Sequence, residues 1–181
     1  MDHAAFTIRT WQETDLPHLL SYLQHLDAAT RSRFAPHPFT AAALHELYHH
    51  PDYTGFLVIE PKSTFIIGYA LIKKGYLEHD YARLAAYGIV PNSKTDATYA
   101  PSLAKEWQGQ GLGALLWEKI RKTLQTRGIR RVILWGGVQA GNEQAIRYYQ
   151  KLGFREWGRF QMNGMENLDM TVTLATGGRN K

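Results

Sequence analysis

A glycine-rich loop is the first feature of this sequence whose residue types and spacing suggest chemistry. It reads Gln108-Gly109-Gln110-Gly111-Leu112-Gly113 and stands where a strand is expected to give way to a helix. The first N–H groups of a helix have no partner within the helix, and they lie at the positive end of its dipole. Glycines let a bulky anion approach the backbone without meeting Cβ atoms. The loop therefore predicts a pyrophosphate site that needs no side-chain charge.

Three alternatives compete for this loop. Gly109-x-Gly111-x-x-Ala114 also fits a relaxed dinucleotide-binding fingerprint, but the next strand ends at Leu134-Trp135-Gly136-Gly137 without the acidic residue that would hold a ribose. A P-loop requires Gly-Lys-Ser/Thr, and here Ala114 follows Gly113. A tight turn with close helix packing explains one or two of the glycines. Three glycines within five residues at a strand-to-helix junction favour a ligand.

A second group of candidate residues lies farther along the chain. Asn142, Ala145 and Tyr149 are separated by three and then four residues, so they share one face of a helix. Asn142 can donate and accept hydrogen bonds, and it serves either as the helix cap or as a contact to a ligand. Tyr149 either presents a reactive phenol or is a core aromatic with a satisfied hydroxyl. Tyr148 suits that second role better.

These two groups resemble the signature of the GNAT family of N-acetyltransferases. Gln108-x-x-Gly111-x-Gly113 is similar to the family's Arg/Gln-x-x-Gly-x-Gly/Ala motif, and Leu103-Ala104-Lys105-Glu106-Trp107 looks like the strand end that precedes it. Asn142-x-x-Ala145-x-x-x-Tyr149, followed by Gly153-Phe154, is similar to the second family motif. The two motifs occur in the family's order, which is a stronger sign than either motif alone.

The resemblance implies a fold, a cosubstrate and residue roles. The expected fold is a single α/β domain over residues 1–181, with an ordered core at 6–175, in which helices flank a mixed, mostly antiparallel sheet. The expected reaction moves an acetyl group from acetyl-CoA to an amine of a small molecule or protein, without a metal. Backbone groups of Leu103 would pair with the pantetheine arm, and Asn142 and Ala145 would line the cofactor. Tyr149 would protonate the departing thiolate, or hydrogen-bond to it.

The general base is missing from its usual place. Family members often carry a Glu at about the position of Thr98, and a threonine cannot do that work. Four ionisable residues nearby in sequence are candidates, directly or through water: Glu78, His79, Asp80 and Asp96. An acyl-CoA sensor with this fold and no turnover is therefore a second hypothesis. A dinucleotide-dependent enzyme is a third, disfavoured by the absent ribose acid.

Hydrophobic periodicity predicts the elements that position these residues. Helices are expected after Thr14-Asp15, after Thr40, over Glu78–Tyr87, from near Gly111 to Gly128, and over Glu143–Leu152. Strands are expected at Phe6–Arg9, Phe56–Ile59, Phe65–Ile72, Tyr99–Ala104, Val132–Trp135, Phe154–Phe160 and Leu168–Leu174. Pro101 predicts a bulge or an unpaired stretch in the strand before the loop. The insertion Lys73–Ala97 is expected to shape the acceptor pocket.

Composition narrows the class of protein. The 181 residues carry a net charge of +5, no cysteine and no apolar run near the ~20 residues that cross a bilayer. Met1–Ala5 does not resemble a signal peptide, so a cytoplasmic protein without membrane attachment is expected. The basic stretch Lys119–Arg131 is better explained as a solvated helix face than as an anionic-ligand site. No nucleic-acid-binding module accompanies it, so no nucleic acid partner is expected.

Two further features bear on partners. His45 and His49 have helical i, i+4 spacing but lack a third ligand, so no metal site is predicted. The final pair of strands, if exposed, is compatible with a homodimer.

Overall fold

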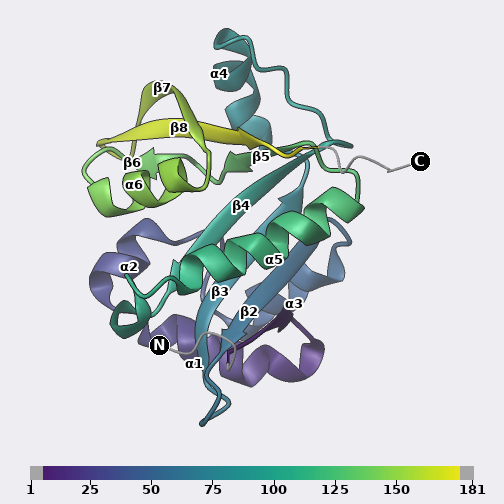
Figure 1. Cartoon of the computed structure of the whole chain (residues 1–181), viewed down its shortest axis with the longest axis vertical. Helices are drawn as coiled ribbons and strands as arrows, with labels where there is room; N and C mark the ends of the chain where they lie inside the picture. Colours follow the sequence, from purple (N-terminus) through teal and green to yellow (C-terminus); the bar gives the residue numbers. More distant parts are fainter. Residues whose placement is uncertain (1–5, 176–181) are drawn as a thin grey trace. The chain divides into compact units, whose positions relative to one another are not determined.

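The helices and strands follow one another in the order of an α/β protein (Figure 1). The computed structural model describes residues 6–175, so Met1–Ala5 and the basic C-terminal residues lie outside the described part. The strands are β1 (Thr7–Thr10), β2 (Tyr53–Ile59), β3 (Ile66–Lys74), β4 (Asp96–Leu103), β5 (Arg131–Leu134), β6 (Val138–Gln139), β7 (Arg155–Met162) and β8 (Met165–Thr173). The α-helices are α1 (Leu16–His25), α2 (Ala28–Arg33), α3 (Ala41–His49), α4 (Tyr81–Ala86), α5 (Leu112–Thr126) and α6 (Glu143–Lys151).

The chain divides into two compact units. The first comprises Met1–Ile72 and Ala100–Lys119, and the second comprises Lys73–Tyr99 and Ile120–Lys181. The division falls inside β3, β4 and α5, and each unit is described separately below. The extent of a single domain over residues 1–181 stays a prediction.

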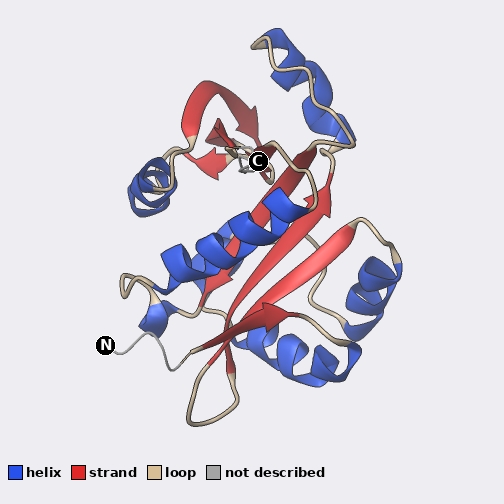
Figure 2. Ribbon diagram, turned by 45° about the vertical axis from the view of Figure 1, so that its right-hand side comes forward, coloured by secondary structure: helices blue, strands red, loops and turns tan. Residues whose placement is uncertain are grey.

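The first unit holds strands in the order β1-β2-β3-β4. β1 runs antiparallel to β2, with Thr7 opposite Ile59, and the Glu60 N–H donates to the Phe65 carbonyl (2.9 Å) across the turn between β2 and β3. Helices lie on both faces of these strands, with α5 on one face and α1 and α3 on the other (Figures 1 and 2). The side chains packed between them are apolar, among them Leu19, Leu23, Leu44, Phe56, Leu71 and Leu116.

Helix starts in the first unit confirm one sequence expectation, refine a second and add a helix that was not expected. Thr40 caps α3 as predicted, since its Oγ1 accepts a hydrogen bond from the Ala43 N–H (3.2 Å). Asp15 stands at the N-cap position of α1, but its carboxylate makes no capping bond there and pairs with Arg9 instead. The six-residue helix α2, capped by Asp27, was not expected from the sequence, because it is too short to show an apolar stripe.

The second unit builds its sheet around β8. Residues Asp96–Tyr99 of β4 run parallel to Arg131–Leu134 of β5, and β5, β6 and β7 each run antiparallel to β8. Antiparallel pairs therefore predominate, which confirms the predicted mixed, mostly antiparallel sheet flanked by helices. The two-residue strand β6 was not foreseen. The β4–β5 pairing ends at Tyr99, two residues before Pro101.

The insertion carries a 3₁₀ turn, Glu78–Asp80, that leads into α4. Gly88 follows this segment with φ of +80°, the left-handed conformation that glycine commonly adopts after a helix. Arg83 of α4 donates to both carboxylate oxygens of Asp169 on β8 (2.6 and 3.0 Å) and to Asp80 (2.7 Å). Its guanidinium lies 3.6 Å from the ring centre of Phe160 on β7. The insertion is thus fastened to the β7–β8 hairpin by one charged side chain.

A tight contact accompanies that ion pair. The ring of Tyr87 lies against the backbone of Gly158 on β7, so that a Cβ at position 158 would come within 2.4–2.7 Å of the ring carbons and hydroxyl. The β7–β8 register also shifts between Glu156 and Gly158. A residue without a side chain at position 158 therefore leaves the space that the Tyr87 ring occupies against this strand.

Candidate functional site

The glycine loop lies in the first unit, between the end of β4 and the start of α5. Gly109 and Gly111 have φ values of +73° and +83°, a backbone conformation that strongly favours glycine. Turn geometry thus accounts for two of the three glycines, as the simpler explanation of the loop required. Gly113 has no such φ and lies inside α5, at its second residue. The geometry of the turn therefore does not explain why position 113 is a glycine.

The first residues of α5 have different exposures. The Leu112 side chain is fully buried, so this residue can offer a ligand only its backbone. Gly111 is exposed and Gly113 is half-buried, so solvent reaches the backbone on either side of Leu112. The positive end of the α5 dipole, the exposed backbone of Gly111 and the missing Cβ of Gly113 are compatible with a bound anion. A pyrophosphate at this loop stays a prediction.

Gln108 fastens the loop to the end of β4. Its Nε2 donates to the Leu103 carbonyl (2.9 Å) and to Thr30 Oγ1 of α2 (3.3 Å). Gln108 therefore acts in this structure as a brace for the loop. The Leu103 carbonyl already accepts this hydrogen bond, so its predicted pairing with pantetheine would use the oxygen's second lone pair or another backbone group.

The second group of candidate residues lies in the second unit, on α6. Asn142 is the N-cap residue, and its Oδ1 accepts a hydrogen bond from the Ala145 N–H (3.3 Å). The structure therefore shows the capping role that was one of two alternatives for Asn142. A contact from Asn142 or Ala145 to a cofactor stays a prediction.

Tyr149 is the buried tyrosine of α6. Only 9% of its surface is exposed, and its ring packs edge-on against Tyr99 (6.5 Å between centroids) and close to Phe154 (5.4 Å). Its hydroxyl makes no hydrogen bond to any of residues 6–175. Burial raises the pKa of the Tyr149 phenol well above its usual value, so the phenol keeps its proton at neutral pH. A protonated, unpartnered hydroxyl is available to donate to a ligand.

Tyr148 contrasts with its neighbour. Its hydroxyl lies 3.4 Å from the hydroxyl of the fully buried Tyr99, and burial raises the pKa of Tyr148 to about 12. This is the satisfied aromatic that the sequence expected at position 148. Tyr99 was not singled out from the sequence, because nothing in a strand pattern shows that its hydroxyl would meet one from α6.

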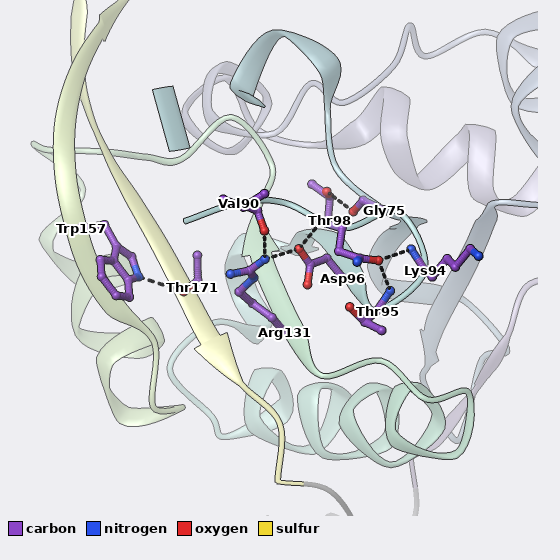
Figure 3. A network of polar contacts seen from close by, with 10 residues as sticks. Gly75, Val90, Lys94, Thr95, Asp96, Thr98, Arg131, Trp157 and Thr171 are labelled. Carbon is purple, nitrogen blue, oxygen red and sulfur yellow. Dashed lines mark hydrogen bonds and ion pairs between the residues drawn. The ribbon is translucent and has the colours of Figure 1, made fainter. Parts of the chain in front are cut away.

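Thr98 stands at about the position expected for the general base, and Asp96 is one of the candidates for that role. Both side chains have hydrogen-bond partners in the second unit (Figure 3). The fully buried Thr98 donates its hydroxyl hydrogen bond to the Gly75 carbonyl (3.0 Å). Asp96 is 2% exposed, pairs with Arg131 (2.5 Å) and accepts a hydrogen bond from the Asn92 N–H (2.8 Å). Both side chains therefore hold the insertion and β5 in place.

The remaining base candidates divide into buried and exposed residues. Asp80 is 2% exposed and bonded to Arg83, and burial raises the pKa of its carboxyl group. His79 lies at the surface with its Nε2 3.5 Å from Asp80, and Glu78 is exposed. None of the four candidates, which are Glu78, His79, Asp80 and Asp96, has a position or partner that identifies it as the general base. Among residues 6–175 there is also no cluster of three or more His, Cys, Asp or Glu that would hold a metal.

No helix in the described part of the chain is long and apolar enough to cross a membrane. The exposed side chains of β7 and β8 include Trp157, Met162 and Met165, as expected for an exposed final strand pair. Whether a second copy covers them stays a prediction.

Comparison with protein families gives one clear match. The model of the acetyltransferase (GNAT) family matches residues 19–154. A [ribosomal protein bS18]-alanine N-acetyltransferase of Salmonella typhimurium is 39% identical over 75 residues, which are 41% of this chain and 49% of that protein. A mycothiol acetyltransferase of an Arthrobacter species is 30% identical over 148 residues, 77% of this chain and 41% of that protein. The chain thus spans about half or less of the length of these curated relatives.

Solved structures share the fold at low sequence identity. The GNAT domain of S. lividans PAT has a TM-score of 0.71 at 20% identity, covering 92% of this chain and 89% of that one. The spermidine N-acetyltransferase from Vibrio cholerae, in complex with CoA and spermine, has a TM-score of 0.70 at 19% identity, covering 95% and 97%. These likenesses confirm the predicted architecture.

Proposed function

Because the chain belongs to the acetyltransferase (GNAT) family, we propose that it transfers an acetyl group from acetyl-CoA to a primary amine of a small molecule or protein. The amine attacks the thioester directly within a ternary complex. The relatives named above acetylate acceptors of different kinds, so their names support the amine class and not one compound. A cytoplasmic location and a homodimer stay predictions from the sequence.

The cofactor's pyrophosphate is assigned to the backbone of Gln108–Gly113. The exposed backbone at Gly111, the start of α5 at Leu112 and the absent side chain of Gly113 support this assignment. Gln108 contributes by holding the loop against the end of β4. Leu103 is assigned to the pantetheine arm, and its backbone would help polarise the thioester carbonyl.

Tyr149 is assigned to the sulfur of CoA, which leaves when the acetyl group is transferred. The carrying observation is the buried phenol that keeps its proton and has no hydrogen-bond partner among residues 6–175. When the tetrahedral intermediate collapses, the C–S bond breaks and the sulfur takes the electron pair. The Tyr149 hydroxyl then donates a proton, or a hydrogen bond, to that sulfur. Asn142 and Ala145, on the same helix, are assigned to the neighbouring part of the cofactor.

A second function has a specific observation in its favour. By the resemblance, Thr98 stands at about the position where family members often carry a Glu, and both Thr98 and Asp96 are buried and bonded within the fold. A protein with this site that binds acyl-CoA without transferring the acyl group would act as a sensor. The substrate ammonium can still lose its proton to water, or to the exposed Glu78 or His79. Acetyl transfer therefore remains the first proposal.

One experiment separates the two functions. The purified protein is titrated with acetyl-CoA by calorimetry, and free CoA release is then measured with a panel of amines that includes polyamines, amino acids and peptides with free N-termini. Release that depends on the amine supports the transferase. Binding without release on any amine favours the sensor, and no binding of acetyl-CoA contradicts both.

A further inference from the structure

His37 is a buried histidine of the first unit, in the segment that joins α2 to α3. It is 9% exposed, and its Nδ1 lies 2.9 Å from the Pro38 carbonyl. A carbonyl oxygen only accepts hydrogen bonds, so Nδ1 carries a proton and donates it. In the neutral ring the other nitrogen, Nε2, is then a bare acceptor. The contact to Pro38 therefore fixes the tautomer of the neutral His37.

Nε2 of His37 is the end of a chain of hydroxyl groups. It lies 3.3 Å from the hydroxyl of Tyr69 on β3, which lies 2.7 Å from the hydroxyl of Tyr48 on α3. Because the bare Nε2 can only accept, Tyr69 donates to His37 and Tyr48 donates to Tyr69. Burial raises the pKa of both phenols, so both keep the protons that this order requires. The order of donors therefore depends on a neutral His37.

The surroundings of His37 do not favour a positive charge. Its ring packs against those of Tyr69 and Phe39 (6.0 and 5.8 Å between centroids), and burial lowers its pKa. The titratable and charged groups facing it are phenols and a cation. They are Tyr69 of β3, Tyr48 of α3 and, 6.0 Å from the ring centre of Phe39, Arg31 of α2. No carboxylate of residues 6–175 bonds His37 or shifts its pKa, so a proton there is uncompensated.

A proton on Nε2 would reverse the chain. A protonated Nε2 must donate, so the Tyr69 hydroxyl has to turn toward Tyr48. The Tyr48 hydroxyl has no other hydrogen-bond partner among residues 6–175, so its own hydrogen loses its acceptor. Phe34, which is 5% exposed and packs edge-on against Tyr69 (5.8 Å between centroids), belongs to the same segment as His37. Protonation therefore weakens the attachment of the segment Phe34–Phe39 to β3.

The segment is joined to the glycine loop through α2. The Phe34 N–H donates to the Thr30 carbonyl (2.9 Å), and Thr30 Oγ1 accepts a hydrogen bond from Gln108 (3.3 Å). Gln108 also donates to the Leu103 carbonyl and so braces the loop against the end of β4. A displacement of Phe34 is therefore transmitted to the residue that holds the loop.

We propose that His37 is a proton switch for the glycine loop: protonation of Nε2 detaches the segment Phe34–Phe39 from β3, loosens the brace at Gln108 and weakens acetyl-CoA binding. The effect on acetyl-CoA rests on the proposed function, whereas the detachment does not. Histidine suits such a switch because its charge changes close to neutral pH. Coupling is reciprocal, so bound acetyl-CoA should make His37 harder to protonate.

Hydroxyl-radical footprinting tests the detachment. Oxidation of Phe34, followed by mass spectrometry from pH 7.5 to 4.5, is expected to rise about threefold or more in the wild type as the charged form becomes populated. Phe65, which is 66% exposed, is the internal reference. His37→Gln can still accept from Tyr69 but cannot take up a proton, so Phe34 should stay protected. Equal rises in both proteins, or a protected Phe34 in the wild type at every pH, would overturn the proposal.

His25→Gln is the matched control. His25 is exposed on α1, and its Nδ1 also bonds a backbone carbonyl, that of Ser21 (2.7 Å). This variant should respond to acid as the wild type does, because other acid effects on the fold are common to all three proteins. Loss of the response in both variants would contradict a specific role for His37.

An NMR titration of the wild-type histidine rings needs no variant. The midpoint for His37 should lie below those of the exposed histidines and should coincide with the rise in Phe34 oxidation. A midpoint at or above those of the exposed histidines would overturn the switch, even if His37→Gln failed to fold.

Calorimetric titration with acetyl-CoA tests the link to the glycine loop. Between pH 7.5 and 4.5 the Kd should rise about threefold more in the wild type than in His37→Gln. The two proteins are compared at each pH, because the terminal phosphate of acetyl-CoA itself titrates near pH 6. Equal losses of affinity overturn the coupling to the loop. No binding at any pH contradicts the proposed function instead, and the footprint of Phe34 then decides the detachment.

Discussion

Arg83 and Asp169, 86 residues apart in the sequence, form a two-pronged ion pair with donor–acceptor distances of 2.6 and 3.0 Å. Asp169 is 1% exposed, and Arg83 is its charged partner on α4. The same guanidinium bonds Asp80, so a single cation serves two buried carboxylates. Both carboxylates are almost completely buried, so solvent cannot replace the charge of Arg83.

Replacing Arg83 should therefore destabilise the protein strongly. Removing one partner of a buried pair leaves an uncompensated charge, and Arg83→Met is expected to lower the free energy of unfolding by about 3 kcal/mol. Urea unfolding at pH 7 measures this change. The control is Arg159→Met, since Arg159 pairs with Glu156 and Glu166 at the surface and should matter little. Equal stability of the two variants would show that the Arg83 pair adds nothing.

Removing the Tyr149 hydroxyl should reduce turnover without weakening the cofactor. Tyr149→Phe is expected to lower kcat by about 10²- to 10⁴-fold, the usual contribution of a positioned acid, with the Kd for acetyl-CoA nearly unchanged. Because burial raises the pKa of Tyr149, loss of its proton should not limit the rate of the wild type at neutral or mildly alkaline pH. Tyr148→Phe, which removes the neighbouring hydroxyl that contacts Tyr99, is the control. Wild-type kcat in Tyr149→Phe removes the acid from the mechanism.

Position 113 distinguishes a pyrophosphate seat from a simple turn. Gly113 lies in α5 without a positive φ, so Gly113→Ala should leave stability unchanged or raise it by about 0.5–1 kcal/mol. Gly113→Val adds a branched side chain at the proposed anion site and is expected to weaken acetyl-CoA binding at least tenfold. Thermal unfolding checks the fold of each variant, and calorimetry measures the affinity. Full affinity in a folded Gly113→Val protein would argue against this seat.

The stability of the first unit should depend on pH through Asp15. Two hydrogen bonds from Arg9 (2.6 and 2.7 Å) hold the pKa of Asp15 below its usual value. The unfolded chain takes up this proton at pH about 3.9 and the folded chain only at lower pH, so the stabilisation is present above that value. It is lost as the pH falls through the folded pKa. Unfolding free energies at pH 7, 4 and 3 should fall more steeply in the wild type than in Asp15→Asn, and parallel curves would contradict the prediction.

The sequence predicted the parts of the fold that repeat along the chain. The helix expected from near Gly111 to Gly128 is present as α5, in which Leu112, Leu116, Ile120 and Leu124 are buried and Leu115 is half-buried. Gly128 follows the helix with φ of +77°. The short elements α2 and β6 were not predicted, because six and two residues are too few to display a hydrophobic period. Pairings between distant residues were not predicted for another reason. The local sequence around Arg83 does not predict that its partner is Asp169, and that around Thr98 does not predict its hydrogen bond to Gly75.

The candidate site was predictable to the same degree. Motif spacing indicated the loop, the shared face of α6 and the contrast between Tyr148 and Tyr149. The capping bond of Asn142 and the brace from Gln108 to Leu103 depend on side-chain directions that a motif does not specify.

The contact between Tyr87 and Gly158 couples the evolution of the insertion to that of β7. Any side chain at position 158 would strike the ring, while a smaller residue at position 87 would leave room for one. A substitution at either position should therefore be tolerated best when the other changes with it. Relatives that lack a large aromatic in this segment should be released from glycine at 158, whereas those that keep the ring should keep the glycine too.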